Sequence, residues 1–152
     1  MIHPMSGLIG TAMDEIRVKN SGFVPRSSIE EGGRGSLLVV EGGQMPFTMA
    51  RVYAIHGVSE LGAVRGMHAH KKTDQAIFII VGELTLHLDD GSSQQSLRLR
   101  EKEDGVRLGP MLWHSMSHFT PDCVALLVAS LPYDESDYIR DYEEFKKYAG
   151  TV

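Results

Sequence analysis

Two histidines separated by a single residue, His68 and His70, stand shortly before the longest apolar run of the sequence, residues 76–81. Alternate residues of a β-strand point to the same face, so both imidazoles would enter one cavity. An imidazole titrates near neutral pH and exchanges protons readily, and it is also a common metal ligand. The spacing therefore predicts a site for proton transfer or for a metal ion.

A second segment carries a third histidine, His114, after a turn rich in glycine and proline and directly after Trp113. Together with Gln75 and Gly82, which follow the first pair, these residues resemble the two-part signature of the cupin superfamily. That resemblance implies a double-stranded β-helix, or jelly-roll barrel. Metal-binding cupins carry a glutamate where this chain has Gln75. Because a neutral amide is a weak ligand, we expect no metal and favour proton transfer, with a metal-dependent cupin enzyme as an alternative.

The elements that must position these residues are short. Apolar segments rich in valine, isoleucine and leucine are bounded by turns that contain glycine and aspartate. This pattern predicts an all-β sandwich or closed barrel. The expected strands are 36–41, 47–55, 76–81, 84–88, 96–99, 105–108 and 124–129. Acidic residues at 134–137 and lysines at 146–147 predict one helix in the tail, packed across the barrel. We expect an N-terminal extension over 1–22 and a single domain over 23–152.

Six motifs in register narrow the resemblance to the sugar 3,4-ketoisomerases of deoxysugar biosynthesis. They span residues from about 24 to 146 and fall at 34–37, 51–53, 65–71, 88–91, 110–114 and 133–140. The resemblance implies an enzyme that needs no metal or other cofactor. Its substrate would be dTDP-4-keto-6-deoxy-D-glucose, whose keto group moves from C4 to C3 ahead of an aminotransferase.

The resemblance also implies catalytic roles for three residues. His70 is expected to be the base at C3, and His68, coupled to Tyr53, the group that shuttles protons at O3, O4 and C4. The residues alone do not rank the two histidines. A structural alternative is that both are core histidines satisfied by hydrogen bonds.

Substrate binding is expected from residues around the same cavity. Arg51, Arg65 and Lys71 would hold the pyrophosphate, since charge-assisted hydrogen bonds suit that group. Trp113 or Tyr53 would stack on a base or sugar ring. Gln75 would hydrogen-bond sugar hydroxyls or orient a histidine. Arg34 and His114 match the members that give a galacto product, so we expect dTDP-3-keto-6-deoxy-D-galactose.

Composition limits the other function classes. The formal net charge is −5 and no run of lysine and arginine exceeds two residues, so nucleic acid is not an expected partner. No apolar run approaches the ~20 residues of a membrane span, and no signal sequence is evident. The single cysteine, Cys123, cannot form an internal disulfide, which agrees with a reducing compartment, the cytoplasm. We expect a homodimer that hides an edge strand, with an N-terminal strand exchanged between copies. A cupin that binds sugar nucleotides without catalysis is the remaining alternative.

Overall fold

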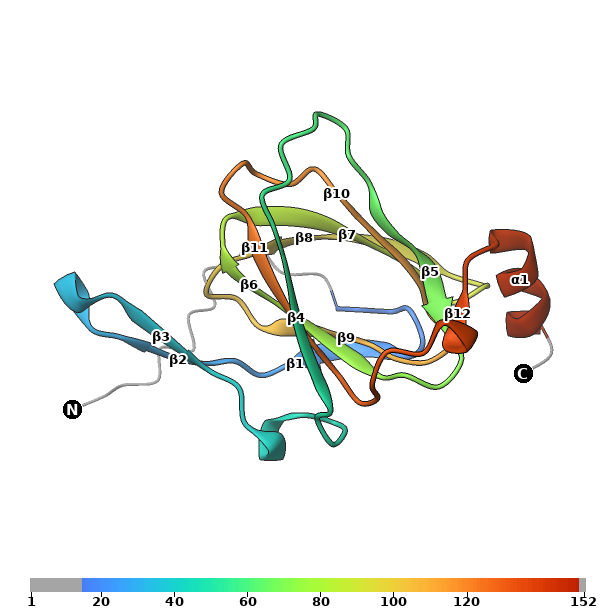
Figure 1. Ribbon diagram of the computed structural model, residues 1–152, viewed down its shortest axis with the longest axis horizontal. Helices are drawn as coiled ribbons and strands as arrows, with labels where there is room; N and C mark the ends of the chain where they lie inside the picture. Colours follow the sequence, from blue (N-terminus) through green and yellow to red (C-terminus); the bar gives the residue numbers. More distant parts are fainter. Residues whose placement is uncertain (1–14, 151–152) are drawn as a thin grey trace.

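Two antiparallel five-stranded sheets pack face to face in the computed structural model, which describes residues 15–150 (Figure 1). The first sheet has the order β1 (Ser21–Val24), β9 (Gly105–Leu108), β6 (Gln75–Val81), β11 (Val124–Ala129), β4 (Arg51–His56). The second has the order β12 (Tyr138–Ile139), β5 (Arg65–His70), β10 (Trp113–Ser117), β7 (Glu83–Asp89), β8 (Gln94–Arg100). This arrangement confirms the predicted all-β barrel.

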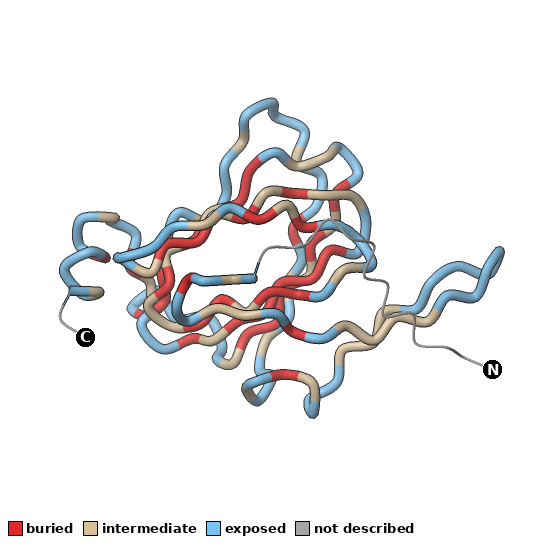
Figure 2. Tube along the Cα trace, turned by 180° about the vertical axis from the view of Figure 1, so that it is seen from behind, coloured by how far each residue is buried: buried red, intermediate tan, exposed pale blue. Residues whose placement is uncertain are grey.

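The core lies between the two sheets, where the buried segments gather in Figure 2. On β7 the leucines at 84, 86 and 88 are buried while the residues between them are partly exposed, as period-two alternation requires. β6 lies in the middle of its sheet, and its first five residues are all buried. The Asp-Asp-Gly turn at 89–91 joins β7 to β8 in the expected hairpin.

The N-terminal boundary differs from the expected one. Val18 is only 4% exposed and belongs to the main core, and β1 pairs with β9 from Ser21 onward. The expected extension therefore covers too much of the chain, because residues from Val18 onward pack on the barrel. Its first part, residues 1–14, lies outside the described residues. Strands β1, β10 and β2 (Ser27–Glu30) escaped the prediction because they are short and carry only one or two large apolar residues each.

The tail is not one helix from residue 134. It forms a 3-10 turn, η3 (Glu135–Asp137), then β12, and only then α1 (Tyr142–Gly150). Tyr138 and Ile139 pair with His70 and Ala69 of β5, so tertiary pairing overrides the local helical pattern. Phe145 of α1 is fully buried and packs on the outer face of β5, which confirms that the tail helix lies against the barrel.

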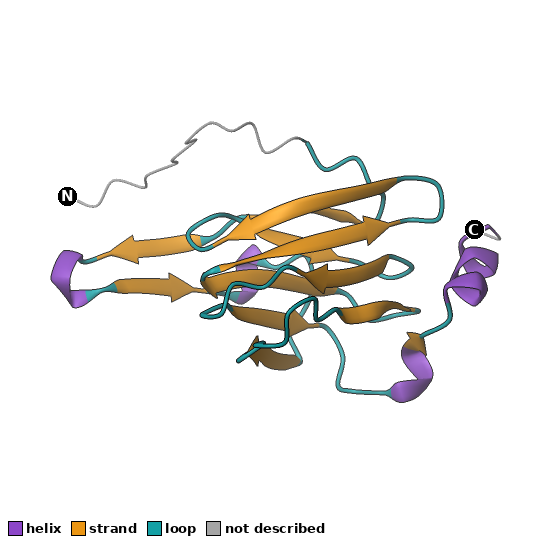
Figure 3. Cartoon of the chain, turned by 90° about the horizontal axis from the view of Figure 1, so that it is seen from above, coloured by secondary structure: helices purple, strands orange, loops and turns teal. Residues whose placement is uncertain are grey.

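A hairpin projects away from the barrel (Figure 1 and Figure 3). It consists of β2 and β3 (Ser36–Val39), with the 3-10 turn η1 (Gly32–Arg34) at its tip. A second short turn, η2 (Gly42–Gln44), leads back toward β4. Within residues 15–150, no helix has the length and apolar character needed to cross a membrane.

Gly82 provides a test of how tightly the barrel closes. Its φ is +77°, and an added Cβ would lie 2.9 Å from the Cα of Cys123. We expect Gly82→Ala to lower the free energy of unfolding by at least about 2 kcal/mol, through left-handed strain and steric overlap. Urea denaturation measures this change. Gly43→Ala is the control, since nothing lies within 4 Å of its added Cβ; equal stability losses in the two variants would contradict this explanation.

Candidate active site

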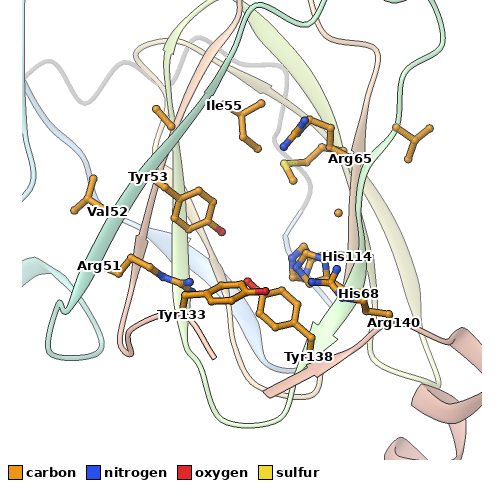
Figure 4. A pocket seen from close by; sticks show the side chains of 14 residues that line it. Arg51, Val52, Tyr53, Ile55, Arg65, His68, His114, Tyr133, Tyr138 and Arg140 are labelled. Atoms are coloured by element: carbon orange, nitrogen blue, oxygen red, sulfur yellow. The ribbon is translucent and has the colours of Figure 1, made fainter. Parts of the chain in front are cut away.

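A pocket of about 550 Å³ opens between the edge strand β4 and the strands β5 and β10 (Figure 4). Strand β4 supplies Tyr53, whose ring points into the pocket from one side. His68 and His114 face it from the other side, and the tail closes one end with Tyr133 and Tyr138. The pocket thus combines residues from four separate parts of the chain.

A β-bulge brings the histidines together. Gly66 and Met67 both have left-handed φ values, +85° and +59°, and the register of β5 against β10 shifts at this point. A Cβ on Gly66 would approach the backbone oxygen of His114 to 3.0 Å, so the close pairing requires glycine here. His68 then lies opposite His114, and their ring centroids are 4.8 Å apart.

His70 lies behind His68 and is only 1% exposed. Its Nδ1 is 3.1 Å from Oδ2 of Asp137, and its Nε2 is 2.7 Å from the amide nitrogen of Gln75. The Tyr53 hydroxyl donates a hydrogen bond of 2.7 Å to Oε1 of Gln75. A continuous chain of hydrogen bonds therefore links Asp137 to the pocket wall through His70, Gln75 and Tyr53.

Burial changes the pKa values of this cluster. Loss of water lowers the pKa of His68 to about 4 and that of His114 to about 3, and neighbouring imidazoles add to both shifts. Burial also lowers the pKa of His70, but the Asp137 carboxylate opposes this effect. Burial raises the pKa of Tyr53 to about 12. At neutral pH the three imidazoles are therefore uncharged and the phenol is protonated.

Three histidines offer the only cluster of metal-ligand type within residues 15–150. One ring nitrogen from each of His68, His70 and His114 lies within 4.8 Å of the others. The available nitrogen of His70 already accepts a hydrogen bond from Gln75. The donor set thus consists of neutral imidazoles and an amide and lacks a carboxylate, so it does not suit a hard ion such as Mg²⁺ or Ca²⁺, whereas three imidazoles can hold Zn²⁺.

Positive charge gathers at the mouth of the pocket, where Arg51, Arg65 and Arg140 contribute to the lining. Arg140 is held by a bidentate pair with Glu135 at 2.7 and 2.9 Å and lies over the ring of Tyr138. Neither Arg51 nor Arg65 forms a salt bridge within the described part of the chain. These two guanidinium groups remain available to an anionic ligand.

Comparison with known proteins agrees with this geometry. The family model described as "FdtA: WxcM-like, C-terminal" matches residues 20–150. The chain belongs to the WxcM-like family. A curated relative from Aneurinibacillus thermoaerophilus, TDP-4-oxo-6-deoxy-alpha-D-glucose-3,4-oxoisomerase, is 42% identical over 120 residues, which cover 78% of this chain and 86% of that protein.

Solved structures of other sugar ketoisomerases superpose on this WxcM-like chain. One is the 3,4-ketoisomerase QdtA from Thermoanaerobacterium thermosaccharolyticum, a histidine-to-asparagine mutant in complex with TDP-4-keto-6-deoxyglucose. It has a TM-score of 0.82 and 32% identity and covers 88% of this chain and 96% of its own. Another is the TDP-quinovose 3,4-ketoisomerase WlaRB from Campylobacter jejuni, with a TM-score of 0.78, 32% identity and coverage of 86% and 99%.

Seven of the expected site residues lie in the WxcM-like pocket or in its hydrogen-bond chain. Five of them line the pocket: Tyr53, His68, His114, Arg51 and Arg65. Two lie immediately behind this wall, His70 and Gln75. The expected coupling of Tyr53 to His68 takes another form, because the hydroxyl of Tyr53 donates to Gln75.

Three expected residues do not reach this pocket. Trp113 and Lys71 directly adjoin inward-facing histidines, so alternation turns both side chains outward. Trp113 packs against Tyr142 and Phe145 of α1, and Lys71 lies over the ring of Tyr148. Arg34 lies at the tip of the projecting hairpin with its side chain 82% exposed.

The sequence reading assigned no site role to four tail residues: Tyr133, Asp137, Tyr138 and Arg140. All four lie within the family motif at 133–140. Membership of that motif is the one sequence feature that could have identified them as site residues. Their local pattern of acidic and aromatic residues predicts a solvated helix. The position of the tail beside β5 gives them their place at the pocket instead.

The depressed histidine pKa values predict a stability that depends on pH. Between about pH 6.5 and pH 4 the unfolded chain binds more protons than the native one, so the free energy of unfolding falls as the pH falls. We expect His114→Gln to reduce this slope, because His114 is 2% exposed and its pKa is about 3. Urea midpoints measured across this range test the slope. His56→Gln, at an exposed position, is the control; an unchanged slope in His114→Gln would contradict the assignment.

Proposed function

We propose that this chain isomerises dTDP-4-keto-6-deoxy-D-glucose to the corresponding 3-keto sugar nucleotide. The observation that carries this proposal is the buried pair of His70 and Asp137 next to a pocket lined by a second and a third neutral histidine. The curated relative at 42% identity bears the name of that activity. A structure of QdtA, 32% identical, contains TDP-4-keto-6-deoxyglucose.

The reaction needs proton transfers and no external oxidant. A base removes the proton from C3, and the electrons of that C–H bond form a C3=C4 double bond as O4 gains a proton. The resulting enediol then loses the proton on O3, and C4 gains a proton to give the 3-ketone. One C–H and one O–H bond break and one of each forms, so the sugar is isomerised without net oxidation. Imidazoles near a ketone suit these steps.

The surroundings of the histidines support the roles expected from the resemblance. His70 has a carboxylate partner, so a proton that it takes from C3 is stabilised as an imidazolium next to Asp137. His68 lines the pocket and has two imidazole neighbours, which suits a neutral group that passes protons at O3, O4 and C4. Tyr53 adds a protonated hydroxyl on the opposite wall.

Arg51 and Arg65 are the proposed ligands of the pyrophosphate, since each lines the pocket and neither is paired with a carboxylate in the described chain. In this proposal Tyr133 and Tyr138, whose rings lie 5.6 Å apart at one end of the pocket, stack on the base or sugar ring in place of Trp113 or Tyr53. In this proposal Gln75 orients His70 through its hydrogen bond to Nε2, one of the two roles expected for it.

We further propose a galacto product, dTDP-3-keto-6-deoxy-D-galactose. The support is the pair of residue types that this chain shares with galacto-type members, Arg34 and His114. His114 borders the pocket beside His68, where it can influence the face on which C4 receives its proton.

A histidine-to-asparagine exchange tests the catalytic base. We expect His70→Asn to lower isomerisation and solvent deuterium incorporation by about 10²–10⁴-fold, since general-base catalysis contributes that much. TDP affinity should stay within a few-fold, because the pocket arginines are retained. NMR of dTDP-4-keto-6-deoxy-D-glucose in heavy water measures the exchange and the configuration of the product at C4.

The matched control is His87→Asn, on the outward face of β7, where the ring bonds to Ser96 and Ser117. Its activity should equal that of the wild type. Wild-type protein that binds TDP without exchanging the C3 proton would instead be a non-catalytic sugar-nucleotide-binding cupin. Loss of the wild-type activity on chelation, restored by a divalent metal, would support the metal-dependent alternative.

We propose that the protein is a homodimer with an exchanged N-terminal hairpin. We also propose that it works in the cytoplasm, a reducing compartment, because its single cysteine is free and buried. Strand β4 is the outer strand of its sheet in the described chain and carries Val52 at 62% exposure. The hairpin carries Leu37 at 50% exposure and projects from the barrel (Figure 3). A hairpin from a second copy, laid along β4, would cover this edge and bring Arg34 to the pocket mouth.

Mixed dimers test this arrangement. We expect Arg34→Ala alone to lower kcat/KM about 10–100-fold through loss of a charge-assisted contact. Coexpressed with inactive His70→Asn, it should regain about one quarter of wild-type activity, because half of the dimers are mixed and each then has one intact site. Activity no higher than the average of the two variants would contradict an exchanged hairpin that supplies Arg34.

A further inference from the structure

Asp137 is a buried carboxylate whose partners hold it in one orientation. It is 6% exposed and stands in η3, between the barrel and the tail. Its Oδ1 accepts a hydrogen bond of 2.7 Å from the amide of Lys72, and its Oδ2 accepts from the amide and the hydroxyl of Thr73. These groups belong to the turn that directly follows β5, so the strand that carries His70 also fixes its carboxylate partner.

The hydrogen bonds keep Asp137 ionised. Burial alone would raise its pKa, but the donors of Thr73, Lys72 and His70 together hold the pKa below its usual value. An ionised carboxylate only accepts hydrogen bonds. The Nδ1 of His70 must therefore carry the proton in this pair.

That assignment determines every other donor and acceptor in the chain. With its proton on Nδ1, His70 presents a lone pair at Nε2, which accepts from the Gln75 amide at 2.7 Å. The amide oxygen of Gln75 then points the other way and accepts from the hydroxyl of Tyr53. The four side chains thus form one consistent network, whose direction starts at Asp137.

We propose that Asp137 is the positioning residue of the isomerase: it holds His70 in the tautomer with an unprotonated Nε2 and stabilises the imidazolium formed on proton abstraction. This inference rests on the proposed function. The rest of the surroundings disfavours a charged His70. Its ring packs on Tyr138 at 4.4 Å and near the neutral rings of His68 and His114, and Arg51 and Arg140 add positive charge. In the described chain, Asp137 alone pairs His70 with negative charge.

An asparagine at this position reverses the direction of the network. Its amide can donate to Nδ1 of His70, which moves the ring proton to Nε2 and removes the lone pair that a base needs. We expect Asp137→Asn to lower kcat by about 10²–10⁴-fold, as for an aspartate that orients a catalytic histidine elsewhere. KM and TDP affinity should change only a few-fold, because Asp137 does not line the pocket.

Two further measurements separate positioning from a structural role. The first is the imidazole nitrogen NMR of ¹⁵N-labelled wild-type protein, which reports the tautomer of His70. We expect the proton on Nδ1 in the wild type and on Nε2 in Asp137→Asn. The second is the pH profile of kcat/KM. Loss of the carboxylate lowers the pKa of His70 further, so the acid limb should move to lower pH.

Asp89→Asn is the matched control. Asp89 is also buried, at 7% exposure. It accepts hydrogen bonds from Tyr142, Gln94 and the amide of Gly91, and none of these partners is a histidine. This variant should lose stability and retain kcat. A proton on Nε2 of wild-type His70, or an Asp137→Asn enzyme within about threefold of wild-type kcat, would overturn the inference. Wild-type protein that does not exchange the C3 proton would refute the proposed function instead. If Asp137→Asn failed to fold, the tautomer of His70 in the wild type would still test the role of Asp137.

Discussion

The enclosure of three imidazoles, two buried and one half-buried, in one bent pair of strands is the constraint on which the rest of the site depends. The bulge at Gly66 and Met67 allows His68 to lie opposite His114. His70 follows two residues further along β5. Taken out of water, such rings remain uncharged unless a carboxylate compensates them. Within the described chain, His70 is the one histidine of the three that pairs with a carboxylate, that of Asp137. The different roles proposed for the histidines rest on this asymmetry.

Much of this arrangement could be predicted from local sequence. Period-two alternation and turn residues identified most strands of the barrel, and the spacing of His68 and His70 placed both on one face. The same rule, applied to the residues next to the histidines, would also have turned Trp113 and Lys71 away from the pocket. Their packing against α1 is therefore a consequence that the sequence already contained.

Other parts depend on contacts that no local pattern reveals. Asp137 reaches His70 across 67 residues, and β12 pairs with β5 although Tyr138 stands in a stretch of helical character. The turn at 71–73 offers three donors to the carboxylate, and this long-range gain outweighs continuation of a helix through η3. The place proposed for Arg34 is a similar case, since its hairpin projects from its own barrel and the proposed pocket contact is made on another copy.

Gln75 shows how one substitution separates two kinds of barrel chemistry. An amide can donate to Nε2 of His70 and accept from Tyr53 at the same time, and it adds no charge. A glutamate in its place would accept from both sides and set a second carboxylate against the same ring. Flanked by two anions, His70 would be held as an imidazolium, which has no lone pair for a substrate proton. A carboxylate at position 75 favours a bound cation, whereas the amide leaves a neutral base with one counter-charge. The acid–base role proposed for the histidines therefore depends on the identity of this single side chain.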